Sequence, residues 1–259
     1  MTHFKCLTYK HKASSTIQRA LAQLSFMHTI LAMTTAPQHL GYALLFCLLF
    51  QACVTPITIG TPTQAATPEQ VAELTYNLTS NTTFDLQPNL IYYLDETLVI
   101  QNLDSYTLNG NGSTIIQRNP NADVIRIEGG NKVTLKNFKA THTEPSGPLG
   151  CTGSVIQVYN SSNATINNCH LNGSGIIGVV AYDASNLNVT SSYIYNNSQY
   201  GILYQGSTSI SITNNRFDDN GVTGSAHVAK ALNAFLSEID MMSGDENKAG
   251  ATMSGNKYE

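Results

Sequence analysis

The amino-acid sequence predicts an all-β protein in which short strands stack on one another, coil upon coil, in parallel sheets. Three observations lead to this fold class: an internal repeat, apolar residues paired two positions apart, and a polar surface made of amides and hydroxyls. Charged residues account for 12% of the 259 residues, whereas Asn alone contributes 25. This composition excludes a coiled coil, which needs Glu and Lys in quantity. The net charge of −4, without a basic run, argues against nucleic-acid binding.

The repeat is clearest where residues 178–194 align with residues 201–217 at an offset of 23. Earlier units begin 23, 31 and 27 residues before their successors, at Ile156, Ile125 and Leu98. The tail of one more unit is indicated at 253–258, which begins 41 residues beyond Ile212. We therefore expect about six coils. A β-propeller, with units of about 40 residues, does not fit this period.

Every unit follows the same order: an apolar pair, a polar corner, a second apolar pair, and then a small or amide residue. In the unit at 179–194 the pairs are Val179/Ala181 and Leu187/Val189. Residues two apart lie on one face of a strand, and strands this short bury that face only by stacking on copies of themselves. The small or amide position is expected at a tight bend, where stacked Asn side chains hydrogen-bond along the axis. This position is assigned to Asn111, Cys169, Ser192, Asn215 and Asn256, with Phe138 as the exception.

Two of these strings, residues 186–194 and 209–217, resemble the repeats of right-handed parallel β-helices. Residues 92–113 are similar to the opening coils of the pectin-lyase-like superfamily. The resemblance covers roughly residues 84–258, and it implies a single-stranded right-handed parallel β-helix with three short strands in each coil. It is specific for the fold only, because that superfamily includes lyases, hydrolases, epimerases, adhesins and stalks.

Residues 1–66 are expected to form an export signal or leader region. The apolar core at 40–50 is too short for the roughly 20 residues of a membrane-spanning helix and has the length of a secretory segment. Lipid attachment at Cys53 and cleavage after a small-residue stretch near residue 66 remain alternatives, as do translation starts at Met27 and Met33. A buried hydrophobic helix is the competing interpretation. The expected location is secreted, cell-surface or periplasmic.

The remaining chain divides into a cap and a solenoid. Residues 67–83 are expected to form an N-terminal cap that begins with a short helix, with Thr67 as the N-cap and Pro68 at the first helical position. Such a cap covers the otherwise open end of the core. Residues 84–259 are expected to form the parallel β-helix, incomplete at its C-terminus.

The resemblance implies that the first strands of the coils form the floor of a substrate groove. Tyr rings stack on the CH faces of sugars, and amides bind sugar hydroxyls. The candidate catalytic residues are Arg126, Glu128 and Asp183. The candidate substrate-binding residues are Gln157, Tyr159, Tyr182, Gln205 and His142. The alternative is a solvated strand face with ordinary side-chain pairs, Arg126 with Glu128 among them.

Two units are lengthened, and insertions in a solenoid fall on loops that often line the binding edge. The first insertion spans 141–153 and contains His142. The second follows Asp218, and its middle, 225–242, is expected to be helical because its apolar residues have helical spacing. Both insertions follow the third strand of a coil, so we expect them to border the same groove.

The sequence contains none of the superfamily's catalytic signatures. Asp218-Asp219 is not followed by Gly-His-Gly, Arg126 has no adjoining Asp stack, and no Asp-Pro-His-Glu string is present. No Cys/His cluster has zinc spacing, so no metal ligands are assigned. No cofactor is expected. If the protein has a pectate-lyase-like activity, calcium is the ion that it would use.

Two functions from different classes remain open. The first is an exported β-helix protein that binds or processes extracellular polysaccharide, as a lyase or a glycoside hydrolase. The second is a non-catalytic structural or adhesion protein of the cell surface. The expected partner is a polysaccharide or other glycan and not a nucleic acid, with membrane contact only through the signal or a lipid at Cys53. The oligomeric state is left open.

Overall fold

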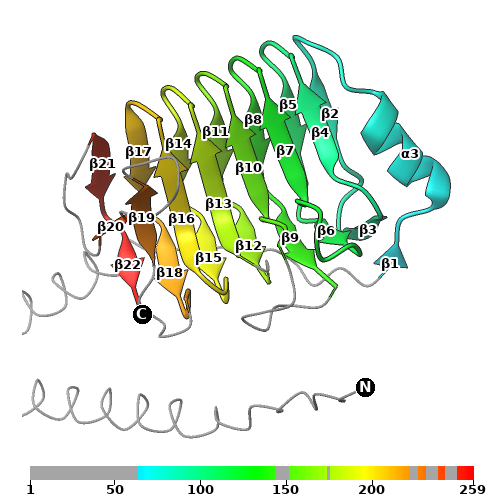
Figure 1. Ribbon diagram of the computed structural model, residues 1–259. Helices are drawn as coiled ribbons and strands as arrows, with labels where there is room; N and C mark the ends of the chain where they lie inside the picture. Colours follow the sequence, from blue (N-terminus) through cyan, green and yellow to red (C-terminus); the bar gives the residue numbers. More distant parts are fainter. Residues whose placement is uncertain (1–63, 144–151, 174–175, 222–226, 232–238, 243–249) are drawn as a thin grey trace, which may run out of the picture. The chain divides into compact units, whose positions relative to one another are not determined.

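The computed structural model describes residues 64–143, 152–173, 176–221, 227–231, 239–242 and 250–259. These residues form a parallel β-solenoid of about six coils (Figure 1). The predicted leader, including Cys53, lies outside the described residues apart from its last three positions. No helix in the described ranges has the length and apolar character needed to cross a membrane.

Three sheets run along the solenoid. Each coil contributes one strand to each sheet, and the last coil adds a second, antiparallel strand to the first sheet. The first sheet consists of β4 (Leu98–Gln101), β7 (Ile125–Glu128), β10 (Ile156–Tyr159), β13 (Ile177–Tyr182), β16 (Tyr200–Gln205), β19 (Val228–Ala231) and β20 (Ile239–Met242). The second consists of β2 (Thr83–Asp85), β5 (Thr107–Asn109), β8 (Thr134–Lys136), β11 (Thr165–Asn167), β14 (Asn188–Thr190), β17 (Ile210–Thr213) and β21 (Ala251–Ser254). The third consists of β1 (Gln64–Ala65), β3 (Leu90–Leu94), β6 (Thr114–Gln117), β9 (Lys139–His142), β12 (His170–Asn172), β15 (Tyr193–Tyr195), β18 (Arg216–Asp218) and β22 (Lys257–Tyr258).

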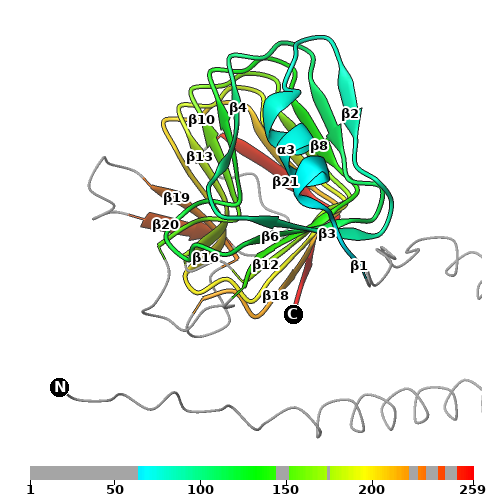
Figure 2. The ribbon, with the colours of Figure 1, turned by 90° about the vertical axis from the view of Figure 1, so that its right-hand side faces the viewer.

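The strand register is the one that the repeat offsets predict. Ile156 pairs with Ile125 on one side and with Val179 on the other, and Ile212 pairs with Met253. All named strand pairs are parallel except β19 with β20. The inward residues of the pairs are buried in one continuous core. Figure 2 shows the three sheets that surround it end-on. The predicted fold class is therefore confirmed.

The corners of the coils explain why the chain needs so many Asn residues. In the five coils from β8 to β21, the residue that directly follows the strand of the second sheet has a positive φ, a conformation that Asn and Gly adopt more readily than other residues. These residues are Asn137, Asn168, Ser191, Asn214 and Gly255. A second column follows the first sheet and consists of Asn102, Gly129, Asn160, Asp183 and Gly206. Many Asn residues are thus explained by backbone conformation in addition to hydrogen bonding.

The predicted ladder of small and amide residues is present at the same bend. The backbone N–H of Ser192 donates to Oδ1 of Asn215 at 2.9 Å, and the N–H of Asn215 donates to Oδ1 of Asn256 at 3.0 Å. The N–H of Cys169 likewise donates to Oγ of Ser192. Each side chain therefore satisfies a buried donor of the preceding coil, which would otherwise be costly.

The assignment of Asn111 to this ladder is wrong, because Ser113 holds that position. The Oγ of Ser113 accepts a hydrogen bond from the N–H of Leu90 at 3.2 Å. The connection from β5 to β6 is two residues longer than the connection from β8 to β9, as the register of the two strand pairs shows. A fixed offset carried over from the other coils therefore points to the wrong residue here.

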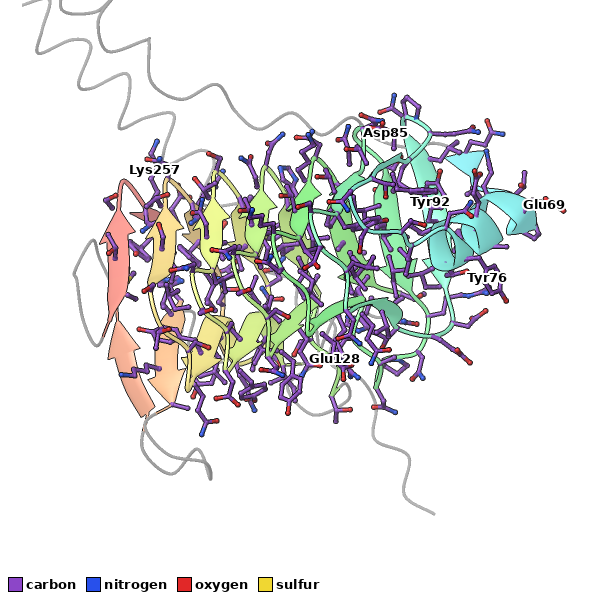
Figure 3. The ribbon with its side chains drawn as sticks, turned by 90° about the horizontal axis from the view of Figure 1, so that it is seen from above. Glu69, Tyr76, Asp85, Tyr92, Glu128 and Lys257 are labelled. Atoms are coloured by element: carbon purple, nitrogen blue, oxygen red, sulfur yellow. The ribbon has the colours of Figure 1, made fainter. Side chains whose placement is uncertain are left out.

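The N-terminal cap begins as predicted. Helix α3 (Pro68–Tyr76) starts with a capping box: the N–H of Gln70 donates to Oγ1 of Thr67, and the N–H of Thr67 donates to Oε1 of Gln70. Leu74 is fully buried in the core of the solenoid. Figure 3 shows the helix, with Glu69 and Tyr76, at one end of the stack.

The prediction of a helix within 225–242 is wrong for the residues that the structure describes. Residues 228–231 form β19 and residues 239–242 form β20. Val228 pairs with Ile202 and so begins the next rung of the first sheet. One of the apolar residues whose spacing predicts a helix, Val228, lies instead on the inward face of a strand. A short apolar segment does not distinguish the helical period from the strand period.

Two neighbouring asparagines provide a test of the corner and the ladder. Asn215 is 1% exposed, and its side chain bonds to Ser192 N, Val189 O and Asn256 Oδ1. Replacing it (Asn215→Gly) should lower the free energy of unfolding by about 2–4 kcal/mol, because these partners lose their bonds inside the core. Asn214 has φ +57°, so Asn214→Gly should change stability by less than about 1 kcal/mol. Urea unfolding of both variants measures the difference; equal losses would contradict the ladder.

Candidate functional site

The candidate residues of the first sheet lie side by side on its outer face. One row crosses the strands through Arg126, Gln157 and Val180, and the next row runs through Glu128, Tyr159, Tyr182 and Gln205. The rows alternate with the inward apolar residues, so their side chains point away from the core. Because neighbouring strands are about 4.8 Å apart, the second row forms a line of four closely spaced polar and aromatic side chains.

Only part of this face is open. Tyr159 has 44% of its surface exposed, whereas the outward residues Val180 and Leu203 are 2% and 1% exposed. The last two belong to a second apolar cluster with Ile177, Ala229 and Ala231, separate from the core. The row of Arg126 is therefore buried from β13 onward, whereas Tyr182 and Gln205 of the other row stay partly exposed. We call the accessible group Arg126, Glu128, Gln157, Tyr159 and Tyr182 the Tyr159 face.

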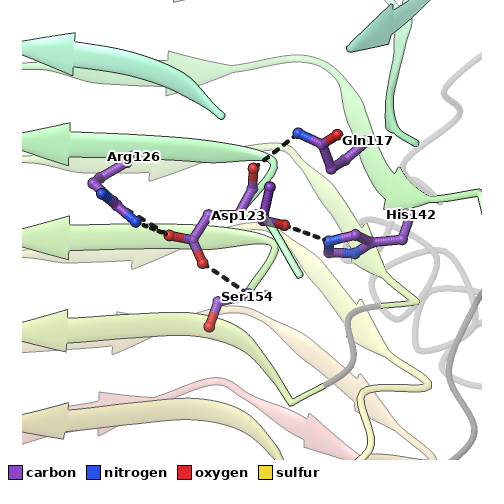
Figure 4. A network of polar contacts seen from close by, with 6 residues as sticks. Gln117, Asp123, Arg126, His142 and Ser154 are labelled. Atoms are coloured by element: carbon purple, nitrogen blue, oxygen red, sulfur yellow. Dashed lines mark hydrogen bonds and ion pairs between the residues drawn. The ribbon is translucent and has the colours of Figure 1, made fainter. Parts of the chain in front are cut away.

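Arg126 is held by a residue that the sequence analysis did not identify. Its Nε and Nη2 donate to Oδ2 of Asp123 at 3.3 and 2.8 Å, and Oδ1 of Asp123 accepts the N–H of Ser154 at 2.8 Å (Figure 4). Asp123 is 8% exposed. The ion pair of Arg126 is thus with Asp123 and not with Glu128, and it fixes the direction of the guanidinium. The only signal in the sequence is a carboxylate just before an apolar strand.

The same turn is anchored by Gln117 of β6, which precedes it, and by His142 of β9 in the next coil. Nε2 of Gln117 donates to the carbonyl oxygen of Asp123 at 3.2 Å, and Nε2 of His142 lies 2.8 Å from the carbonyl oxygen of Ala122 (Figure 4). The other ring nitrogen of His142 lies 3.1 Å from the carbonyl oxygen of Gly173. These contacts hold the loop in front of β7 in one position.

The expectation that His142 lies on an exposed loop is wrong. His142 is the last residue of β9, and 2% of its surface is exposed. A side chain this buried is not placed to contact a polysaccharide on the outer face. The strand extends farther than the repeat implied because residues 141 and 142 pair with β6.

Tyr182 keeps its phenolic proton at neutral pH. Burial raises the pKa of Tyr182 above its ordinary value of 10, and the negative charge of Asp123 raises it further. The hydroxyl is therefore available as a hydrogen-bond donor as well as an acceptor. Tyr182 is half-buried against the second apolar cluster, and it pairs in register with Tyr159 on the adjoining strand.

Asp183 stands apart from the other candidate catalytic residues. It occupies the positive-φ corner after β13, with φ +50°, and its N–H donates to the carbonyl oxygen of Gln205 at 3.0 Å. By the strand register it lies two strands over from β7, which places it roughly 14 Å from Arg126 and roughly 10 Å from Glu128 between Cα atoms. The structure brings Arg126 and Glu128 together on one strand, but it does not bring Asp183 to them.

No group of three or more His, Cys, Asp or Glu side chains is arranged to hold a metal ion within the described part of the chain. The calcium prediction rests on the resemblance alone and stays a prediction. Cys169 is buried, and burial raises the pKa of its thiol to about 12, so it is neither a thiolate ligand nor a nucleophile at neutral pH.

The chain is similar to several solved structures at low sequence identity. ORF18 of Geobacillus virus E2 is 12% identical, with a TM-score of 0.52 over 66% of this chain and 37% of that protein. A candidate glycosyl hydrolase from Parabacteroides merdae is 11% identical (TM-score 0.40; 66% of this chain, 97% of that one). The Agl-KA catalytic domain is 16% identical (TM-score 0.33; 61% and 39%). This chain therefore spans little more than a third of the viral protein, and the likeness concerns the fold alone.

The family comparison agrees with the observed fold. No curated protein matches the chain. The family described as "Right handed beta helix region" matches residues 74–256, which runs from the capping helix to the last coil. The chain belongs to this right-handed beta helix family.

Proposed function

We propose that this protein binds an extracellular polysaccharide on the Tyr159 face. The observation that carries the proposal is the exposed ring of Tyr159, flanked on the adjoining strands by the carboxylate of Glu128 and the phenol of Tyr182. An exposed ring provides a flat apolar surface for the CH face of a sugar, and the neighbouring groups bind hydroxyls. Gln157 adds an amide to this face, and Gln205 adds another next to it, beside Tyr182 on the adjoining strand.

The face is suited to a long ligand because its spacing is fixed by the sheet. The strands that carry it are hydrogen-bonded on both sides, so the side chains are preorganised and little ordering is needed on binding. Export by the predicted leader would place the protein where such glycans occur, at the cell surface, in the periplasm or outside the cell. A lipid at Cys53 would keep it at the membrane.

Cleavage of the bound chain is the second candidate function. It is favoured by one observation: Arg126 is fixed by Asp123 and shares the outer face of β7 with Glu128. Such an oriented cation stabilises negative charge that develops on a substrate. Asp183 would act from a separate position along the same ligand, and calcium would serve this candidate only. A purely structural or adhesive solenoid needs none of these groups.

Binding is tested by replacing the exposed ring. Tyr159→Ala should weaken binding to a responsive glycan by about 5- to 30-fold, which corresponds to the roughly 1–2 kcal/mol of one exposed stacking contact. Isothermal titration with a panel of soluble uronans and neutral glycans measures it. The thermal midpoint should hardly change, because Tyr159 lies outside the core.

Tyr76 provides the matched control. It is 84% exposed and lies on α3 at the capped end of the solenoid (Figure 3). Tyr76→Ala should leave glycan affinity unchanged. The absence of binding to every glycan by the wild-type protein, or equal losses in both variants, would remove the proposed face.

Cleavage is tested by product release. If the second candidate holds, the wild-type protein should release reducing ends or unsaturated products from at least one glycan, and Arg126→Ala should lower the rate at least 100-fold through lost charge stabilisation. Lys132, a cation at a corner of the same coil, serves as the control in Lys132→Ala. Full activity of Arg126→Ala would exclude a catalytic role for this residue.

A further inference from the structure

His227 is the one histidine of the last coil, and its ring is packed among aromatic side chains. It is 6% exposed, and its centroid lies 5.9 Å from Phe217 and 5.4 Å from Tyr258. The rings of Phe217 and Tyr258 are themselves stacked, at 5.3 Å and 4°. Nδ1 of His227 is buried without a hydrogen-bond partner. At Nδ1 the ring therefore makes packing contacts but no hydrogen bond.

The earlier coils have no such ring at the equivalent position. By the pairing of Ile202 with Val228, His227 takes the place of Gly201, which itself follows Gly178. A Cβ on Gly201 would meet the carbonyl oxygen of His227 at 2.5 Å and Cδ1 of Phe217 at 3.0 Å. The glycine in the preceding coil thus leaves room for the backbone carbonyl of His227 and the ring of Phe217. The imidazole itself, just before β19, packs against Phe217 of β18 and Tyr258 of β22.

The ionisable groups around His227 act in opposite directions. Asp218 and Asp219, on β18 and in the turn after it, favour the charged ring, but burial has the larger effect and lowers the pKa of His227 below 6.5. From β22, the ring of Tyr258 faces the imidazole. Arg216 and Lys257 neighbour each other on the outer side of β18 and β22, where Arg216 pairs with Glu259. The folded state therefore favours neutral His227.

We propose that His227 makes the last coil acid-sensitive: protonation of its ring detaches β19 and β22 while the earlier coils stay folded. An imidazolium carries a second N–H that needs an acceptor, and Nδ1 has none in the packed coil. Detachment would expose the free edges of β16 and β18 for pairing with another chain. This property is independent of glycan binding on the Tyr159 face.

The direction of the pH dependence follows from linkage. Because the folded state holds the proton less tightly than the unfolded state, the stability of the last coil is complete above about pH 6.5 and falls as the pH drops toward the lowered pKa. Each unit of lowering corresponds to a tenfold change in the opening equilibrium. The effect is local, since amides open in separate cooperative units.

Hydrogen exchange of the full chain between pH 7.5 and 5, corrected for the intrinsic rate, tests this. Peptides that cover β19 and β22 should lose at least about tenfold in protection on acidification, whereas peptides that cover β7 and β10 should not. His227→Phe, and His227→Leu as a second non-titrating variant, should remove the pH dependence. His170→Gln, a half-buried histidine on the third sheet, should behave as the wild type.

Proton NMR of the wild-type protein provides a readout without any substitution. The His227 ring should titrate below pH 6.5, together with the loss of protection. The proposal is overturned if the ring titrates at or above 6.5, if protection in β19 and β22 does not depend on pH, or if both non-titrating variants lose protection in the same way as the wild type.

Discussion

Each coil of this protein is stable only because its inward apolar residues are covered by the same positions of the next coil. Ile125, Ile156 and Val179 are 0% exposed, yet each lies on a strand of four to six residues that has no core of its own. Burying one such side chain contributes about 1.5–3 kcal/mol. The contribution exists only when the register is kept, since a shift by one residue would turn every pair outward. The fold therefore depends on the parallel register more than on any single contact.

The corners make that register possible. A narrow coil must turn within one or two residues, so it uses positive φ, and Asn137, Asn168 and Asn214 supply it at one bend. The backbone donors left at the bend are satisfied by side chains of the next coil, such as Asn215 and Asn256. Low charge, abundant Asn and a regular repeat thus have one structural cause. The same rigidity presents Tyr159 and its neighbours at strand spacing, which supports a binding surface that does not need to rearrange.

The sequence predicts the coils well because sequence offset and strand register are the same quantity in a solenoid. It therefore places Arg126 beside Gln157 and Glu128 beside Tyr159 correctly. It fails where a coil departs from the repeat, as at Ser113. Side chains from turns are also missed: Asp123 pairs with Arg126 only because the turn before β7 folds back. The period does not encode exposure either, so it does not reveal that Val180, which points outward, is buried. The candidate site was thus predictable in position but not in its supporting contacts or its accessible extent.

Distances between spin labels on the second sheet test the parallel register most directly. Thr107, Ser211 and Thr252 share one outward row, with Ser211 four strands and Thr252 five strands from Thr107. The Cα separations are therefore about 19 and 24 Å. Pulsed electron–electron double resonance is measured on two proteins, one labelled at Thr107 and Ser211 and the other at Thr107 and Thr252. Both should give narrow distance distributions, and their mean distances should differ by one strand spacing, about 5 Å. Broad distributions, or two means that do not increase with the number of coils, would contradict the stacked solenoid.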